Sequence, residues 1–265
     1  MRRLLLAAAI LLGMAAPAAA GPSSSAASAP TRPAAEIAAF AKSVEQALAS
    51  RGVHVAIVAR IGRDPRELPE GLSYTHVAFW VYATIRTRDG GVAPGYAVFN
   101  LYQDDSNGNH SSLKQDFPVD FFADVYQLRA GVIVPTPELQ ARLLQTIASP
   151  TYAHLHNPAY SLVANPFARR YQNCTDFVLD VLTSAIYRTD DVAVIQADER
   201  AYFTPQVIAV GGLRRALAPI FVSGMHTDDQ GREIRTATFQ SLARFLQTYR
   251  LADAVFDVPE AAPAN

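Results

Sequence analysis

Hydrophobic residues in the first half of the chain follow a helical spacing and then a strand pattern. Apolar positions within 34–50 recur with the period of an amphipathic helix, and Gly52 ends it. The β-branched run at 53–61 and the apolar runs at 75–85 and 96–103 predict strands, with a turn at 89–91 between the last two. This order predicts an antiparallel meander.

The second half of the chain has mainly the pattern of helices joined by polar loops. A capped start with proline at its first position opens 136–147, and 174–187 carries a continuous apolar face, so both segments predict helices. Further helices are expected at 119–128, 207–217 and 238–251, a brief strand at 132–135, and loops at 64–71, 104–112 and 154–166. The pattern favours one α+β domain over 34–258, with a flexible leader at 21–33 and a disordered tail at 259–265.

The first twenty residues have the pattern of an export signal. Arg2 and Arg3 supply a positive end, 4–14 an apolar stretch too short to span a bilayer, and 18–20 a small-residue cleavage site. No other segment has the length of a membrane span without charges. We therefore expect a periplasmic protein that does not span the membrane.

Composition narrows the classes of function. The 23 basic and 24 acidic residues nearly balance, which gives no electrostatic reason to expect nucleic acid as a partner. Hydrophobic residues make up 50% of the chain, enough for one sizeable core. The sequence has no Gly-x-Ser-x-Gly elbow, phosphate-binding glycine loop, dinucleotide fingerprint or His-Glu-x-x-His motif. No cofactor is expected.

Cys174 is the only cysteine, and it lies where a loop meets the apolar helix at 174–187. At a helix start, unpaired N–H groups and the helix dipole stabilise a thiolate. An unpaired thiol in an exported protein is also exposed to oxidation, so the presence of Cys174 despite this risk favours a catalytic role. The alternative is that Cys174 is a small buried hydrophobic residue.

His76 is the best candidate for a base that would activate Cys174. It lies at the start of an otherwise apolar strand, where a polar ring suggests a functional role. The alternative is that it is a structural histidine with its hydrogen bonds satisfied. Asn100, inside the next strand, could orient the imidazole as the third member of a Cys-His-Asn site does. Gln103 and Tyr102 are weaker alternatives for that role, and Asn100 could simply bond a neighbouring loop.

These segments together resemble a known superfamily. Ser73-Tyr74-Thr75-His76-Val77-Ala78-Phe79, followed by Asn173-Cys174-Thr175-Asp176-Phe177-Val178, resembles the circularly permuted branch of NlpC/P60, in which the histidine strand precedes the cysteine helix. The stretches 100–103, 115–118, 135–140 and 172–175 are similar to the DUF2145 family of uncharacterised bacterial proteins, a similarity from about Val55 to Leu246.

The resemblance implies a papain-like fold with a nucleophile helix packed against an antiparallel sheet. It further implies a cysteine hydrolase that cleaves an amide or related acyl bond, with peptidoglycan-derived peptides as a natural substrate in that compartment. Cys174 would attack the carbonyl and His76 would accept the proton, whereas the orienting role of Asn100 is an inference from its position in the strand and not from the resemblance. Tyr74, Tyr102, Gln103 and Asn173 are expected to border the substrate. The alternative is a non-catalytic periplasmic binding protein that retains the fold.

A metal site is the other chemistry that the sequence offers. His154 and His156 could supply two ligands, and His226 with Asp228 or Asp229 could complete a shell. The neighbouring Asn-Pro sequence makes the first pair part of a loop, and no ligand-spacing motif is present, so a groove or surface role is favoured. The acidic segment 104–109 does not fit a calcium-binding loop, because its glycine comes too early and the final glutamate is missing.

Overall fold

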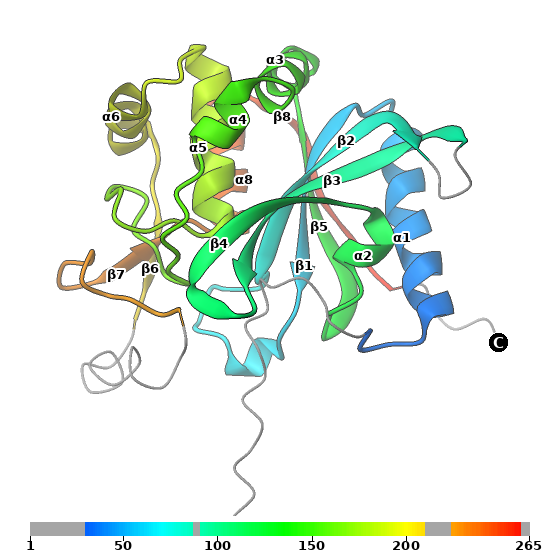
Figure 1. Cartoon of the computed structure of the whole chain (residues 1–265), viewed down its shortest axis with the longest axis horizontal. Coiled ribbons are helices and arrows are strands. Elements are labelled where there is room, and N and C mark those ends of the chain that lie inside the picture. Colours follow the sequence, from blue (N-terminus) through cyan, green and yellow to red (C-terminus); the bar gives the residue numbers. More distant parts are fainter. Residues whose placement is uncertain (1–29, 87–90, 210–223, 261–265) are drawn as a thin grey trace, which may run out of the picture.

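A six-stranded antiparallel sheet forms the centre of the protein, with helices on both faces (Figure 1). The computed structural model describes residues 30–86, 91–209 and 224–260. The expected export signal (1–20), most of the leader, the last five residues of the tail and most of the helix expected at 207–217 lie outside the described residues. The expected mixed α+β class is confirmed.

The described elements alternate strands and helices along the chain. The strands are β1 (Val55–Ile61), β2 (His76–Arg86), β3 (Val92–Asp104), β4 (Asn107–Asp116), β5 (Gln127–Pro135), β6 (Gln206–Ile208), β7 (Ile234–Thr236) and β8 (Ala252–Val258). The helices are α1 (Ala34–Ala49), α2 (Pro118–Phe121), α3 (Pro137–Ile147), α4 (Pro150–His154), α5 (Cys174–Tyr187), α6 (Val192–Tyr202) and α8 (Phe239–Thr248), with a 3₁₀ turn η1 (Pro65–Glu67).

The strand order of the large sheet is β4-β3-β2-β1-β5-β8. The predicted meander is confirmed in β1, β2 and β3, where Ile57 pairs with Phe79 and Phe79 with Phe99. Pairing between β2 and β3 runs from Arg86 only as far as Phe79, whereas pairing between β2 and β1 continues to His76. The first residues of β2, from His76 to Ala78, therefore pair with β1 but not with β3.

Alternation along β2 divides the interior into two cores. Val77 and Phe79 belong to the core that includes α3, α5 and α8, while Ala78 and Trp80 belong to the core beneath α1 and α2. Successive side chains of a strand point to opposite faces. His76 therefore shares a face with Ala78 and Trp80, and its ring contacts Phe121 of α2 at a centroid distance of 5.6 Å.

Two expectations about irregular structure were wrong, and both segments form edge strands. The loop expected at 104–112 is largely strand β4, which pairs only with β3, and the segment after 251, for which no strand was expected, forms β8, which pairs only with β5. An edge strand has one free side and few buried positions, so its sequence lacks the apolar alternation that identifies inner strands. The assignment of β8 depends on β5, a partner strand that is distant in the chain.

The helix expected at 119–128 was also wrong in extent. Only the single turn α2 forms, and β5 begins at Gln127 because Ile61 of β1 pairs with that residue. The segment 206–208, expected to begin a helix, pairs instead with β7. Helix α6 was not expected. None of the helices in the described ranges has both the length and the apolar character needed to cross a bilayer.

Candidate functional site

His76 is fully buried at the start of β2, and one of its ring nitrogens is held by Asn100. The Nε2 atom of His76 lies 3.0 Å from Oδ1 of Asn100. The other ring nitrogen, Nδ1, is buried and has no hydrogen-bond partner. The structure thus brings together the two residues that the sequence analysis paired as base and orienting group, and it leaves one imidazole nitrogen buried without a hydrogen bond.

Aromatic rings and a buried cation enclose the imidazole. Tyr102 stacks on the His76 ring with a centroid distance of 4.9 Å and an interplanar angle of 12°, and only 1% of Tyr102 is exposed. The Arg60 side chain is fully buried on β1, its guanidinium lies 5.9 Å from the centroid of the Tyr102 ring, and its Nη1 donates to the Phe121 carbonyl. Tyr102 therefore shields the His76–Asn100 bond from water and does not present a free surface to a substrate.

Cys174 is the first residue of α5, and Asn173 is the N-cap of that helix. The Asn173 side-chain oxygen accepts the N–H groups of Thr175 at 3.0 Å and Asp176 at 2.9 Å, and it leaves the N–H of Cys174 unoccupied by that cap. The Asn173 amide nitrogen donates to the Leu162 carbonyl and the Thr236 hydroxyl, each at 3.2 Å. Asn173, expected to border the substrate, thus directs its side-chain groups to the protein itself.

We expect Asn173→Ala to lower the free energy of unfolding by about 1–2 kcal/mol, because the helix loses its side-chain cap. Asn173→Ser is the matched comparison, since its hydroxyl can still accept an N–H group of the first turn and, like alanine, it lacks the amide donor to Leu162 and Thr236. Urea unfolding of both variants checks this. Equal losses in the alanine and serine variants would show that the cap contributes nothing measurable.

The thiol of Cys174 reaches the sheet next to His76. The Cys174 side chain is buried in the core that also contains Val77 and Phe177, and a backbone hydrogen bond from Val77 lowers the pKa of the thiol. Val77 follows His76 directly, but the two residues face opposite sides of β2. Among the described residues no hydrogen bond joins the thiol to the imidazole, and the structure places the two expected side chains on opposite faces of β2 rather than in contact.

Burial controls the charge state of both groups. It raises the pKa of the Cys174 thiol, more strongly than the Val77 backbone, the Thr175 hydroxyl and the Arg60 charge lower it. It also lowers the pKa of His76 well below its ordinary value, an effect that Arg60 reinforces and the bond to Asn100 opposes. The resting pair is therefore a neutral thiol and a neutral imidazole, which can still accept a proton.

The remaining residues expected at a substrate surface have other contacts. The Tyr74 hydroxyl donates to Asp257 at 2.6 Å, and its ring packs on Phe239 with a centroid distance of 4.8 Å. Gln103 is buried, and its amide nitrogen donates to the Gly108 carbonyl at 2.6 Å. The structure gives Tyr74 and Gln103 packing and hydrogen-bonding partners within the fold.

Sequence reasoning missed two polar residues close to His76. Arg60 is a charged residue inside the apolar strand 53–61, the same signal that singled out His76. Asp116 ends β4, and its Oδ2 accepts the Asn100 amide nitrogen at 3.3 Å. Asp116 lies in the stretch 115–118 that is similar to DUF2145, but no role was predicted for it, because most of β4 was expected to be a loop.

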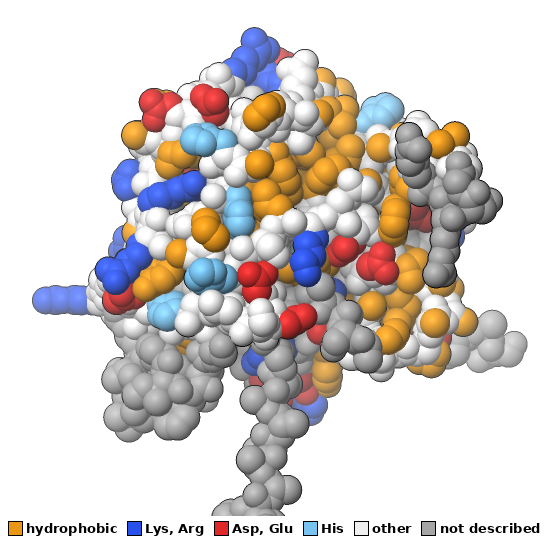
Figure 2. Space-filling model, viewed as in Figure 1, with side chains coloured by type: hydrophobic (Ala, Val, Ile, Leu, Met, Phe, Trp, Pro, Cys, Tyr) orange, Lys and Arg blue, Asp and Glu red, His pale blue; other side chains and the backbone are white. Residues whose placement is uncertain are grey.

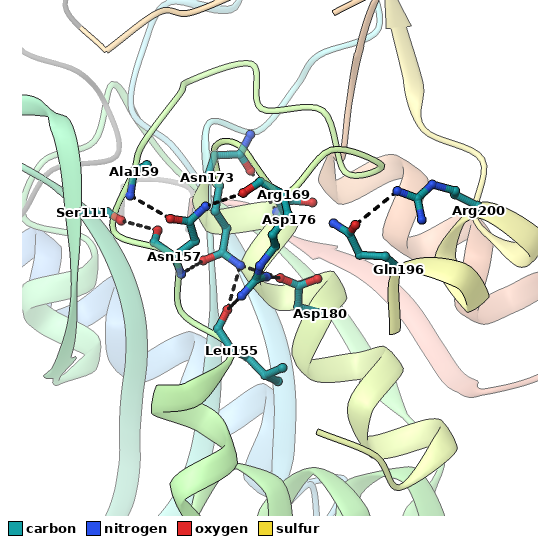
Figure 3. Close-up of polar contacts among 11 residues, drawn as sticks. Ser111, Leu155, Asn157, Ala159, Arg169, Asn173, Asp176, Asp180, Gln196 and Arg200 are labelled. Carbon is teal, nitrogen blue, oxygen red and sulfur yellow. Dashed lines mark hydrogen bonds and ion pairs between the residues drawn. The ribbon is translucent and has the colours of Figure 1, made fainter. Parts of the chain in front are cut away.

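A buried group of acids lies deeper along α5. Figure 3 shows Arg169 reaching Asp180 on α5, and their ion pair measures 2.7 Å. Gln172 also donates to Asp180, and Glu199 of α6 belongs to the same group together with Asp176. Burial raises the pKa of all three acids, and their mutual repulsion raises those of Asp176 and Glu199 further. This network ties the loop before Cys174 to α5.

The histidines proposed as metal ligands do not form a metal shell. Figure 2 shows several histidine side chains on the face that carries α4 and the tip of β4. His156 Nε2 lies 3.0 Å from the Ser111 hydroxyl, and His226 Nε2 lies 2.9 Å from Oδ1 of Asn109. Asp228 pairs with Arg170 at 2.7 Å. Within residues 30–86, 91–209 and 224–260, no group of three histidine, cysteine or acidic residues could hold a metal ion.

Comparison with known proteins identifies the family of the chain. Residues 47–246 match the model of a family described as uncharacterised protein conserved in bacteria, DUF2145. The searches of curated proteins and of solved structures gave no match. The matched range contains His76, Asn100, Asp116 and Cys174, so the whole candidate site lies inside it. The chain belongs to the DUF2145 family.

Proposed function

We propose that this protein is a cysteine hydrolase of the permuted papain-like type that cleaves an amide or related acyl bond. One observation carries the proposal. His76 is buried with Nε2 held by Asn100 and Nδ1 unbonded, and the backbone of the next residue, Val77, meets the sulfur of Cys174 at the start of α5. Further support comes from the order of histidine, asparagine and cysteine along the chain and from the packing of α5 against β2.

In the proposed reaction the Cys174 sulfur attacks the substrate carbonyl while Nδ1 of His76 takes the thiol proton. The C–S bond forms, and the negative charge on the carbonyl oxygen is held by the N–H of Cys174. The intermediate then collapses, the imidazolium returns the proton to the leaving group, and an acyl thioester remains. Water, deprotonated by His76, hydrolyses this thioester and regenerates the thiol. Because the His76 ring and the Cys174 sulfur lie on opposite faces of β2 in the resting protein, this reaction requires the start of β2 to rearrange on substrate binding so that Nδ1 reaches the thiol.

The first twenty residues support a periplasmic location for the proposed hydrolase. Their charge and apolar pattern supports export to the periplasm, where peptidoglycan-derived peptides supply amide bonds. The test is turnover of cell-wall peptides and of activated acyl esters by the wild type and by Cys174→Ala. We expect turnover in the wild type and none above background in the variant. Equal turnover by both proteins would contradict the proposal.

Burial of the thiol favours a second candidate, a binding protein that retains the fold without the chemistry. Only 4% of Cys174 is exposed, and its thiol is neutral at rest. A thiol-directed electrophile distinguishes the two candidates, because a hydrolase must open to its substrate. The binding protein is favoured if Cys174 stays unlabelled in the native protein and reacts only after unfolding.

A further inference from the structure

The orientation of the Asn100 amide specifies which nitrogen of His76 carries a proton. Its Nδ2 donates to Oδ2 of Asp116 at 3.3 Å and lies 3.4 Å from the Val98 carbonyl, and both of these oxygens are acceptors. The amide oxygen therefore faces His76 Nε2, 3.0 Å away. Because a carbonyl oxygen can only accept, Nε2 must be the protonated nitrogen and Nδ1 must carry the lone pair.

Asp116 is placed for this task by the register of the hairpin. Val98 pairs with Asp116 and Asn100 with Lys114, so Asp116 is the diagonal neighbour of Asn100 on the same face of the sheet. The face is the one on which the His76 ring and Tyr102 stack. Burial raises the pKa of Asp116, and hydrogen bonding from the Tyr102 hydroxyl lowers it. The carboxyl is therefore held by Tyr102 as well as by Asn100.

We propose that Asp116 is a positioning residue, which holds the Asn100 amide so that His76 keeps Nδ1 free as the base for Cys174. It touches neither the sulfur nor the substrate, and it acts through Asn100. Without an acceptor at position 116, only the longer contact with the Val98 carbonyl holds the amide nitrogen, so the amide can turn by 180° and present its NH₂ group to the imidazole. The imidazole then changes tautomer, its Nδ1 carries the proton, and it cannot accept one from the thiol. This inference rests on the proposed hydrolase only for its consequence in catalysis.

The tautomer is measured directly by ¹⁵N NMR of histidine-labelled protein. The chain has six histidines, and comparison with the spectrum of His76→Gln assigns the signals of His76. We expect the wild type and Asp116→Asn, whose side-chain oxygen still accepts, to have a protonated Nε2. Asp116→Leu should give a mixture of tautomers. Asp105→Leu, at an exposed position at the other end of the hairpin, is the matched control and should leave the signals unchanged.

Turnover is the second readout. Asp116→Leu should lower kcat by about 10- to 100-fold with little change in KM, because the base is misplaced while the substrate contacts remain. Asp116→Asn should keep most of the activity. A wild-type imidazole protonated at Nδ1, or a leucine variant with the wild-type tautomer and rate, overturns the inference. If the hydrolase proposal alone fails, turnover is absent in every variant while the tautomer shift in Asp116→Leu is still observed.

Discussion

His76→Gln should lower the turnover of an acyl substrate by about 100-fold or more, because a positioned general base contributes about that much to a proton transfer. Glutamine retains a polar side chain beside Asn100 but cannot take a proton from the Cys174 thiol. The measurement is kcat/KM for an activated acyl ester. His54→Gln is the matched control, since His54 is an exposed histidine near the start of β1, outside the candidate site. We expect the control to retain wild-type activity.

The pH dependence of the same reaction provides an independent check. Burial and the Arg60 charge lower the pKa of His76 below its ordinary value of 6.5, so the imidazole stays neutral and able to accept a proton at more acidic pH. The acidic midpoint of kcat/KM should therefore lie below 6.5 in the wild type. A midpoint above that value, or unchanged turnover in His76→Gln, would remove His76 from the role of base.

Glu199→Gln should stabilise the protein increasingly as the pH rises. Both carboxyl oxygens of Glu199 are buried without a hydrogen-bond donor, close to Asp180. Buried acceptors without donors favour the protonated acid, which can itself donate to Asp180. The amide of glutamine has the shape of the protonated acid and donates in the same way, so it should replace Glu199 without a cavity.

Proton linkage determines the direction in which stability changes with pH. Below the ordinary glutamate pKa of 4.5, the folded and unfolded chains both hold the proton, and its binding does not oppose folding. Above that pH the unfolded chain releases the proton while the folded protein retains it, so stability falls as the pH rises. Glutamine at position 199 carries no titrating proton, so the variant does not lose stability in this way. Its gain in the free energy of unfolding should therefore grow by about 2–4 kcal/mol between about pH 5 and about pH 8.

Urea unfolding of wild type, Glu199→Gln and Asp198→Asn at both pH values measures this gain. Asp198 lies on the same helix and is only partly buried, so its variant should follow the wild-type pH dependence. A constant loss of stability in Glu199→Gln at both pH values would contradict the prediction. It would indicate instead an ionised glutamate with an internal partner.

Local patterns identified the elements that carry the candidate site. The helix at 174–187 and the three-stranded meander were recognised because each buries a regular set of side chains along a short stretch. The Asn-Cys pair at the start of α5 was recognised for a similar reason, since an N-cap acts within three residues. Position within a strand also made Asn100 a candidate partner of His76, and the structure shows that bond.

Other features depend on residues that are distant in the chain, and their own sequence does not reveal them. Asp116 becomes the neighbour of Asn100 through the register of a polar edge strand. Glu199 becomes a buried acid because α6 packs against α5 and brings it to Asp180 and Asp176. The His76 ring and the Cys174 sulfur lie on opposite faces of the sheet, because His76 alternates with Val77 along β2 and α5 covers the face of Val77. The periodicity of apolar residues in the sequence indicates which side chains are buried. Which residues they contact depends on how helices and strands that are separate in the chain pack together.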